Sequence, residues 1–541
     1  MITTTLRLDS DTVLHSLVET GGSMHGGCTH AVVHRGRCSL IDCHAPSVAG
    51  FLPVPELILH THVQPEHCAE GAFFPQARIV VPAGTRTLAC DPATWRREAV
   101  TTWDDPAAWG ETRGRERWGI AGAVTHRPPE PPLSDVEEAP AGAAIAFGDC
   151  VFEAVALPAH SPYALGWVLR RAGRVLAVFS GDLVRHPGTL VDLHHLEYGY
   201  GHNALAGMPA MLRALADLGA SQLHPASGPV VAVADARALA CRIEDFLQAA
   251  DWRSPDWSDR PQLQPIDHLG RWQSVAPGVW QMGQFGNPVL FIRADGRALM
   301  VDPGPCDFTN PQRNADFAAD LDRFHAERGL RSVDWALITH IHGDHVDQCA
   351  ALRQRYGCRV VASQLVASVI ADPLRWPYPA LLPWYGLGQT AVPVDAVVAE
   401  GDTWTWDGTE IACMHLPGHC HAHAGYLLDW GDERVAVTGD VVQVNGEAMS
   451  LELGCMANHS VWMGRPGVMT TCERLLGAGV TLNLGGHGSH FRDCDEVYRE
   501  SLRRMERALP LLRNLVPDGD LDRAMLDHRW PRPQPGRPLR G

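Results

Sequence analysis

Four ionisable residues stand close together in the second half of this 541-residue chain, directly after an apolar run. The segment reads WALITHIHGDH, and its ionisable side chains are those of His340, His342, Asp344 and His345. The apolar run predicts a buried strand, whose end gives the following loop a rigid base. Imidazole and carboxylate groups in such a loop suit zinc, with manganese or ferrous iron as alternatives. The segment therefore predicts a metal site, because burying so many ionisable groups without a metal is costly.

Three further candidate ligands lie in the same half of the chain. His419, Asp440 and His487 occur in LPGHCHAH, TGD and GGHG, and each stands at the end of its own predicted strand. Six or seven ligands of these types can hold two metal ions about 3.5–4 Å apart, provided that one carboxylate bridges them. The second half thus predicts a binuclear centre.

The first half of the chain repeats these landmarks in the same order. Its candidate metal ligands are His60, His62, Glu66, His67, His160, Asp182 and His224. The Gly-Asp aspartate follows the loop histidine by 22 residues in the first half and by 21 in the second.

The histidine cluster of the first half matches less well. We align His60-Thr61-His62 with the first two histidines of the second half, which places His67 five residues after His62 instead of three. Glu66 then stands before the last histidine, and the pattern is HxHxxxEH. The sequence leaves three interpretations open: a working metal site, a single or weakly held metal, or a purely structural copy.

The elements that position these residues alternate between strands and helices. Each half begins with a hairpin whose second strand ends on an aspartate, Asp42 or Asp302, and each half closes with an amphipathic helix. In the second half that helix carries apolar residues from Tyr498 to Leu512 at three- and four-residue steps. We therefore predict an α/β protein with similar domains at 1–250 and 274–516, a linker at 251–273 and a flexible tail at 517–541 rich in Pro and Arg.

These residues resemble the metallo-β-lactamase-fold hydrolases, the superfamily that includes glyoxalase II and lactonases. The resemblance rests on THIHGDH, LPGHCHAH, TGD, GGHG and the VDPG strand end at 301–304, and it spans roughly residues 275–490. It implies an αββα sandwich, two sheets face to face with helices outside, here duplicated in tandem. One departure is Asp347-Gln348, where the family usually has Gly-Gly; it affects the expected pocket floor more than the metal.

The resemblance also implies roles for the ligands of the second half. Metal 1 would bind His340, His342 and His419. Metal 2 would bind Asp344, His345 and His487. Asp440 would bridge the two metals, two zinc ions for each active domain. Asp302, and Asp42 in the first half, would orient the metal loop without touching a metal.

Such a centre predicts an enzyme. A water held between two zinc ions has its pKa lowered to about 7, so that hydroxide is available to attack a carbonyl. We expect Asp344 to orient this nucleophile and accept its proton, while His423 either contacts the substrate oxygen or supports a ligand. The expected reaction is hydrolysis of an ester, thioester or lactone. The aromatic stretch at 372–389 predicts either a wall of the substrate pocket or a loop packed on its own domain.

Three other functions stay open. A single-iron dioxygenase of the persulfide dioxygenase type uses similar ligands, so ligand types alone do not separate it from a hydrolase. Nucleic-acid cleavage is disfavoured by the formal charge of −17 and the absence of a basic arm. In the last alternative, the first half is only a structural or dimerisation module.

Composition bounds the setting of the protein. Its hydrophobic fraction of 45% is typical of globular chains. The 15 cysteines include no CxxC pair, and no secretion signal or membrane-spanning run is recognisable. We therefore expect a cytoplasmic protein that binds a small-molecule substrate, with no nucleic acid or membrane partner and with a homo-oligomer possible.

Overall fold

The computed structural model describes residues 2–18, 27–44, 52–91, 131–191, 201–249, 264–372, 391–449 and 467–519, with short gaps at 160, 162, 284–285, 306–311, 421, 443 and 446–447. The chain divides into two compact units. Of the described residues, the first unit takes in those up to Ala249 and those from Pro510, and the second takes in those between Ala250 and Leu509. The domain bounds predicted from the sequence stay a prediction. Within the first unit, the Leu190 amide donates a hydrogen bond to the Leu515 carbonyl at 2.7 Å.

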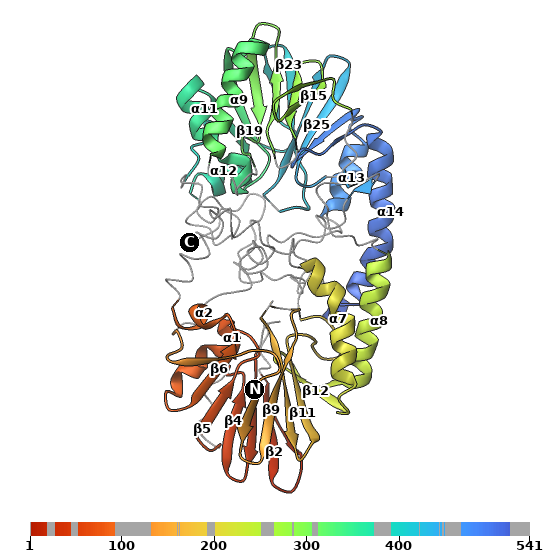
Figure 1. The fold of residues 1–541 in the computed structure, drawn as a ribbon. Coiled ribbons are helices and arrows are strands. Elements are labelled where there is room, and N and C mark those ends of the chain that lie inside the picture. Colours follow the sequence, from red (N-terminus) through yellow and green to blue (C-terminus); the bar gives the residue numbers. More distant parts are fainter. Residues whose placement is uncertain are drawn as a thin grey trace. The chain divides into compact units, whose positions relative to one another are not determined.

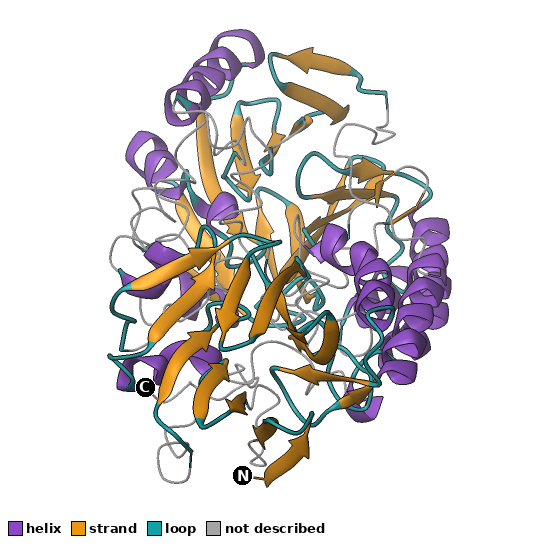
Figure 2. Ribbon diagram, turned by 60° about the horizontal axis from the view of Figure 1, so that its bottom comes forward, coloured by secondary structure: helices purple, strands orange, loops and turns teal. Residues whose placement is uncertain are grey.

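Both units combine helices and strands (Figure 2). None of the helices in the described part of the chain is long and apolar enough to cross a membrane. All 13 cysteines in that part are free thiols.

Two sheets build the first unit. The seven strands of its first sheet, in spatial order, are β1 (Ile2–Arg7), β2 (Thr12–Val18), β3 (Cys28–His34), β4 (Arg37–Ile41), β5 (Pro55–Leu59), β6 (Arg78–Pro82) and β7 (Val136–Ala139). The six strands of its second sheet are β13 (Val231–Ala232), β12 (Gln222–Pro225), β11 (Arg174–Gly181), β10 (Leu165–Arg171), β9 (Cys150–Ala156) and β8 (Ala144–Phe147). Its helical segments are α1 (Pro65–Cys68), η2 (Ala69–Phe73), α2 (Arg86–Cys90), α7 (Gly201–Ala216) and α8 (Val233–Ala249).

The second unit also has two large sheets. The first contains β14 (Asp267–Leu269), β15 (Trp272–Ala276), β16 (Val279–Met282), β17 (Val289–Ile292), β18 (Arg297–Val301), β19 (Ser332–Ile338), β20 (Arg359–Ser363) and β21 (Ala396–Val398) in that order. The second contains β22 (Thr403–Trp406), β23 (Thr409–His415), β24 (Ala424–Trp430), β25 (Glu433–Gly439), β28 (Leu482–Gly485) and β29 (His490–Phe491). β26 (Val444–Asn445) and β27 (Ala448–Met449) form a separate pair. The helical segments are α9 (Arg313–Arg328), α10 (Gly343–Val346), α11 (Cys349–Tyr356), α12 (Gln364–Ile370), α13 (Val468–Leu476) and α14 (Cys494–Arg513). The end of α14 from Pro510 and the short η7 (Pro517–Gly519) belong to the first unit.

The strand directions follow the same pattern in both units. In the first sheet of each unit, antiparallel hairpins are followed by parallel pairs, which begin at β4–β5 and at β18–β19. In the second sheet, an antiparallel meander is followed by one parallel pair, β11–β12 or β25–β28, and then by one antiparallel edge strand. The predicted hairpin of the second half is confirmed as β17–β18, with Val289 opposite Val301.

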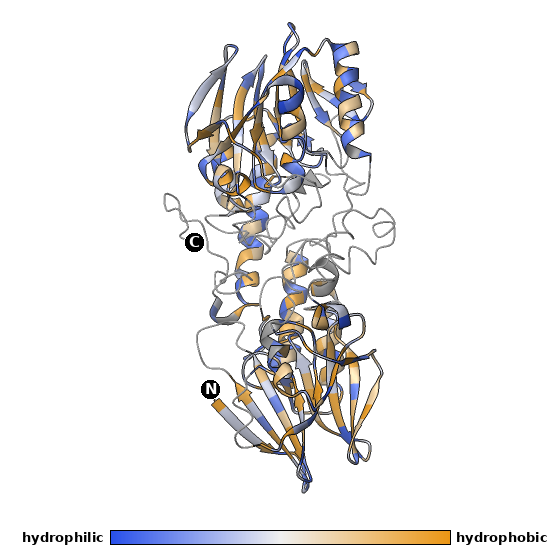
Figure 3. Cartoon of the chain, turned by 90° about the vertical axis from the view of Figure 1, so that its left-hand side faces the viewer, coloured by the Kyte–Doolittle hydropathy of each residue, from blue (hydrophilic) through white to orange (hydrophobic). Residues whose placement is uncertain are grey.

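In each unit the two sheets pack face to face through apolar side chains. In the second unit Phe291 and Leu337 of one sheet belong to the same buried cluster as Tyr426 and Leu482 of the other. In the first unit Leu59 meets Phe152, Trp167 and Phe179 in the corresponding way. Hydrophobic stretches accordingly recur along the strands of both units, interrupted by more polar positions (Figure 3). Each large side chain buried in this way contributes about 1.5–3 kcal/mol.

Helices cover the outer faces. In the second unit α11 packs on β19 and α12 on β20, while α14 lies over the other sheet, where the Tyr498 hydroxyl donates to Asn483 Oδ1 of β28 at 2.8 Å (Figure 1). In the first unit α2 packs on β6 and β7, and α7 packs on α8 (Figure 1). The layers are those of an αββα sandwich, as predicted, and the predicted closing helix is confirmed as α14.

Candidate metal centres

The candidate ligands of the second unit follow the ends of its parallel strands. The metal loop follows β19, and Asp440 and His487 come just after β25 and β28. β25 and β28 are parallel neighbours, so the loops that carry Asp440 and His487 leave the same edge of their sheet. The metal loop follows a strand of the other sheet, and His340 in that loop forms an isolated bridge with His423, next to β24 of the second sheet. His419 reaches the same place from the loop between β23 and β24.

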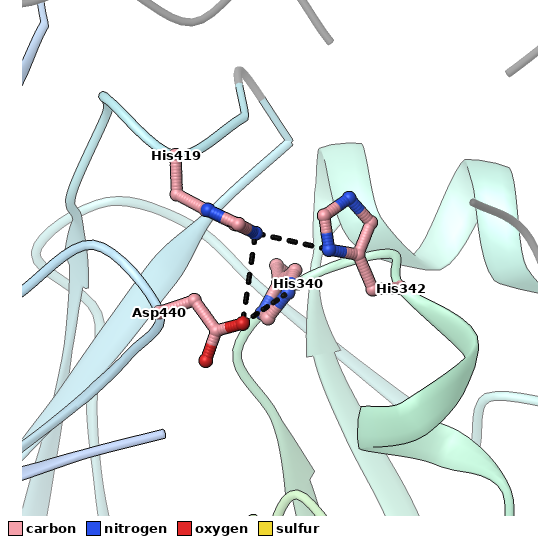
Figure 4. Close-up of side chains that lie close together, drawn as sticks. All are labelled: His340, His342, His419 and Asp440. Carbon is pink, nitrogen blue, oxygen red and sulfur yellow. Dashed lines mark hydrogen bonds and ion pairs between the residues drawn. The ribbon is translucent and has the colours of Figure 1, made fainter. Parts of the chain in front are cut away.

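Four of these side chains form a first group. His340, His342, His419 and Asp440 offer donor atoms that all lie within 4.8 Å of one another. Figure 4 shows them pointing toward a common centre, with the two histidines of the metal loop on one side and His419 and Asp440 on the other. His419 Nε2 lies 2.9 Å from His342 Nδ1 and 3.7 Å from Asp440 Oδ2.

A second group shares Asp440. It consists of Asp344, His345, Asp440 and His487, again with donors within 4.8 Å of one another. His487 Nε2 lies 3.0 Å and His345 Nε2 3.3 Å from Asp440 Oδ2, and the same two nitrogens lie 3.8 and 3.6 Å from Asp344 Oδ2. Tetrahedral donors about 2.1 Å from a zinc ion are separated by roughly 3.4 Å. The observed separations scatter around that value, so the donor set fits zinc.

Three of the donor atoms lie on buried side chains and make no hydrogen bond within the described part of the chain. His340 and His345 are 0% exposed, and Asp440 is 3% exposed. His340 Nε2, His345 Nε2 and Asp440 Oδ1 have no hydrogen-bond partner among the described residues. Buried polar atoms are almost always paired, so this arrangement calls for a bound cation.

Burial also sets the protonation of the imidazoles. It lowers the pKa of His340 and His419 well below the ordinary histidine value, and that of His342 to about 4. The neutral imidazole, with a free lone pair, is the form that binds a metal. For His345, burial also acts to lower the pKa, but the carboxylates around it, those of Asp440, Asp344 and Asp302, outweigh burial and raise it well above the ordinary value.

Asp302 holds the metal loop from behind, as the resemblance implied. Its carboxylate accepts hydrogen bonds from the Thr339 amide at 2.8 Å, the Thr339 hydroxyl at 2.6 Å and His345 Nδ1 at 2.9 Å. The last bond leaves Nε2 of that ring to face the donor group. Asp302 has a φ of 49°, a left-handed conformation that aspartate adopts more readily than most residues.

A buried asparagine that the sequence analysis did not identify connects two ligands. Asn287 Nδ2 donates to the Asp344 carbonyl at 3.0 Å and to Asp344 Oδ2 at 3.1 Å. Its Oδ1 accepts a hydrogen bond from the His487 amide at 2.8 Å. A lone asparagine ahead of a strand carries no spacing pattern, so only the tertiary structure shows this role.

His423 lies behind the first group and is in none of the donor groups. Its ring is 0% exposed and stacks on that of His340 with centroids 4.8 Å apart. Burial lowers the pKa of His423 to about 3. This position favours support of His340 over contact with substrate.

Gln348, in the unusual Asp347-Gln348 pair, serves the scaffold. Its side-chain amide donates to Asn314 Oδ1 of α9 at 2.6 Å and to Asp347 Oδ2 at 2.9 Å. The aromatic stretch expected near the substrate, with Trp376, Tyr378, Trp384 and Tyr385, lies outside the described residues.

Matching hydrogen bonds fix how the two units correspond. Asp42 accepts from the Thr61 amide at 2.8 Å and from the Thr61 hydroxyl at 2.9 Å, as Asp302 does from Thr339. The Leu165 amide donates to the Thr61 carbonyl, and the Ala424 amide donates to the Thr339 carbonyl, both at 2.7 Å. Thr61 therefore corresponds to Thr339.

This register corrects the sequence alignment. Counting from the paired threonines, His62 corresponds to His340, Glu66 to Asp344 and His67 to His345, and the spacing from the first to the last histidine is five in both units. No insertion is needed. Gln64 takes the place of His342, so the pattern in the first half is HxQxEH.

Two predicted ligands of the first half are therefore wrongly placed. His60 corresponds to Ile338: its carbonyl accepts from Trp167 Nε1, as that of Ile338 accepts from the Tyr426 hydroxyl. His224 lies on β12 opposite Phe179 and packs on that ring at a centroid distance of 5.5 Å.

The position that corresponds to His487 is occupied by Ser227. The amide of Ala226, the residue before Ser227, donates to the Gly181 carbonyl at 2.9 Å. In the second unit the amide of Gly486, the residue before His487, donates to the Gly439 carbonyl at 2.8 Å. Of the remaining predicted ligands, His62, His67 and Asp182 form one donor group. The His160 residue and the Glu66 side chain lie outside the described residues.

Comparison with known proteins assigns the second unit to a family. Residues 282–512 match the model of the metallo-β-lactamase superfamily. This part of the chain is a metallo-β-lactamase superfamily domain.

Curated relatives of this metallo-β-lactamase domain are hydrolases by name. A hydroxyacylglutathione hydrolase of Rhodopseudomonas palustris is 32% identical over 24% of this chain and 41% of the relative. An atrochrysone carboxyl ACP thioesterase of Emericella nidulans is 25% identical over 40% of this chain and 56% of the relative. The chain spans about half the length of the curated relatives it matches. Among solved structures, a metallo-β-lactamase of Cronobacter sakazakii is 18% identical, with a TM-score of 0.34 over 45% of this chain and 99% of that chain.

Proposed function

We propose that the second unit is a binuclear metal-dependent hydrolase that cleaves a thioester, ester or lactone. The observation that carries this proposal is the pair of donor groups that share Asp440. A bridging carboxylate between two sets of three further ligands is the arrangement that holds two metal ions about 3.5–4 Å apart.

Each component of the site has a separate role in the proposed hydrolysis. When bound, a pair of zinc ions supplies a nucleophile at neutral pH and polarises the carbonyl of the substrate. Asp344 orients the attacking water and accepts its proton. Asn287 fixes the Asp344 carboxylate for that task, because one of its oxygens accepts the 3.1 Å hydrogen bond from the asparagine amide. The reaction needs no serine, cysteine or lysine nucleophile.

A thioester is the first substrate class to test. Both kinds of curated relatives carry names that describe removal of an acyl group from a carrier, glutathione in one case and an acyl carrier protein in the other. We propose a small-molecule or carrier-linked acyl substrate and no nucleic acid, given the net charge of −17. Zinc as the metal, a cytoplasmic location and homo-oligomerisation are likewise proposals.

The test combines metal removal with a matched pair of histidine variants. The full chain is stripped with a chelator, reloaded with zinc, and assayed on acylglutathione thioesters, p-nitrophenyl esters and lactones. We expect turnover to disappear and return with zinc. His342→Ala should lose at least 100-fold in kcat/KM, whereas His490→Ala, an equally buried histidine that lies outside the donor groups, should stay within a few-fold.

Two results would contradict the proposal. Full turnover of the stripped chain would exclude a metal role. Stoichiometric iron in the purified protein, with oxygen uptake on a persulfide and no hydrolysis, would instead support the dioxygenase alternative.

A further inference from the structure

The first unit contains a second buried donor group with a different composition. His62, His67 and Asp182 are 1%, 1% and 3% exposed, and their donor atoms lie within 4.8 Å of one another. His67 Nε2 lies 3.0 Å and His62 Nε2 3.5 Å from Asp182 Oδ2. Both separations agree with the roughly 3.4 Å edge of a tetrahedral zinc site.

The corrected register shows which ligands this site lacks. Gln64 replaces the histidine that belongs to the first donor group of the second unit, and Ser227 replaces the one that belongs to the second group. A neutral amide and a neutral hydroxyl are poor substitutes for imidazole as zinc ligands. Each of the two positions has therefore lost one strong ligand.

The three ligands that remain still meet at one point. His62 corresponds to a ligand of the first group, His67 to a ligand of the second, and Asp182 to the carboxylate that the two groups share. All three donor atoms are close enough to bind the same ion. With one shared carboxylate and one imidazole from each side, the described residues offer a complete three-ligand set for one cation and an incomplete set for two.

We propose that the first unit binds one divalent metal ion, held by His62, His67 and Asp182, rather than a pair. The proposal concerns only the first unit and does not depend on the hydrolase activity proposed for the second. The competing explanation is a metal-free ion pair between the carboxylate and the two imidazoles.

The experiment compares two buried histidines of the same unit. The unmodified chain and the variants His67→Gln and His224→Gln are purified at full length, loaded with zinc and freed of excess metal. The zinc content per chain is then measured for each. His224 is 3% exposed but lies outside the donor group, so it is the matched control. We expect His67→Gln to hold one zinc ion fewer than the full chain and His224→Gln to hold the same number.

Because the result is a difference between chains, a failure of the binuclear proposal for the second unit would not affect it. A difference of zero for His67→Gln would support the metal-free ion pair, and a difference of two would mean a binuclear first unit; either overturns the proposal. Loss of zinc in His224→Gln would overturn it as well.

A second measurement needs no variant and so covers the case in which His67→Gln fails to fold. Anomalous diffraction at the zinc edge from crystals of the unmodified, zinc-loaded chain should show one peak between His62, His67 and Asp182. Two peaks there, or none, would refute the single-ion site.

Discussion

Asn287 provides the sharpest test of how the proposed centre is held together. Its side-chain amide makes three hydrogen bonds, two to Asp344 and one from the His487 amide, and it is 2% exposed. Replacing it by alanine removes all three, and no water has easy access to take their place. Residues that orient metal ligands in this way are typically worth 10–100-fold in metal affinity. We therefore expect Asn287→Ala to weaken the more weakly bound zinc ion of the second unit by about 1.4–2.7 kcal/mol.

The charge of the replacement sharpens the prediction. Asn287→Asp keeps the acceptor for His487 but loses the donor to Asp344, and it sets two like charges about 3 Å apart. We expect this variant to bind zinc at least as weakly as the alanine variant.

The assay is competition for zinc between the protein and a chromophoric chelator, with circular dichroism to confirm folding. Asn483→Ala is the matched control, because Asn483 is equally buried but bonds to Tyr498 and Thr438, away from the donor groups. It should lose stability and keep its zinc affinity. If Asn287→Ala bound zinc within twofold of the unmodified chain, the assignment of Asn287 as a positioning residue would be wrong.

Three further predictions follow from single contacts. Gly486→Ala would bring a methyl group to 1.8 Å from Asp440 Oδ1, so the bridging carboxylate must move, and kcat/KM should fall by about 100-fold with loss of bound zinc. Tyr426→Phe removes the 2.7 Å bond from a buried hydroxyl to the Ile338 carbonyl and should cost about 1–3 kcal/mol in denaturant unfolding without changing the zinc count. In the first unit, burial opposes ionisation of Asp9, but bonds from the Asp11 amide and from Arg171 lower its pKa from 3.8 to about 2. Because the pKa of Asp9 is lower in the folded than in the unfolded chain, this stabilisation is present above pH 4 and disappears as the pH falls toward 2. The difference in unfolding free energy between the unmodified chain and Asp9→Asn should therefore shrink from about 1 kcal/mol at pH 6 toward zero.

The second half of the chain was open to prediction because its signals are local. The metal loop, the Gly-Asp aspartate and the last histidine each come at the end of a recognisable apolar run. Residue types within a few positions of that run suffice to suggest the ligands. The hairpin β17–β18 and the helix α14 were visible for the same reason, since hydrophobic periodicity and turn residues define them.

The ligands of the first half were partly mispredicted, because the alignment of the two halves depends on contacts between residues that are distant in the sequence. His60-Thr61-His62 has the spacing of two ligands, yet only one of these histidines faces the donor group. What decides between them is the bond from Thr61 to Asp42, a residue 19 positions away, and no count along the chain contains that information. His224 shows the same error at the end of the unit, where the equivalent position, Ser227, comes three residues later.

The comparison of the two units separates the scaffold from the ligands. The aspartate–threonine bond between backbone amide and carboxylate is 2.8 Å in both units, although one metal loop carries His342 and the other Gln64 at the same place. The loop geometry is therefore set by the strand ends and the aspartate behind them, not by the identity of each ligand. A ligand can then change without refolding the loop, and the number of ions bound can differ between two sites built on the same framework. For this reason, zinc counts on single-residue variants should report on metal binding rather than on folding.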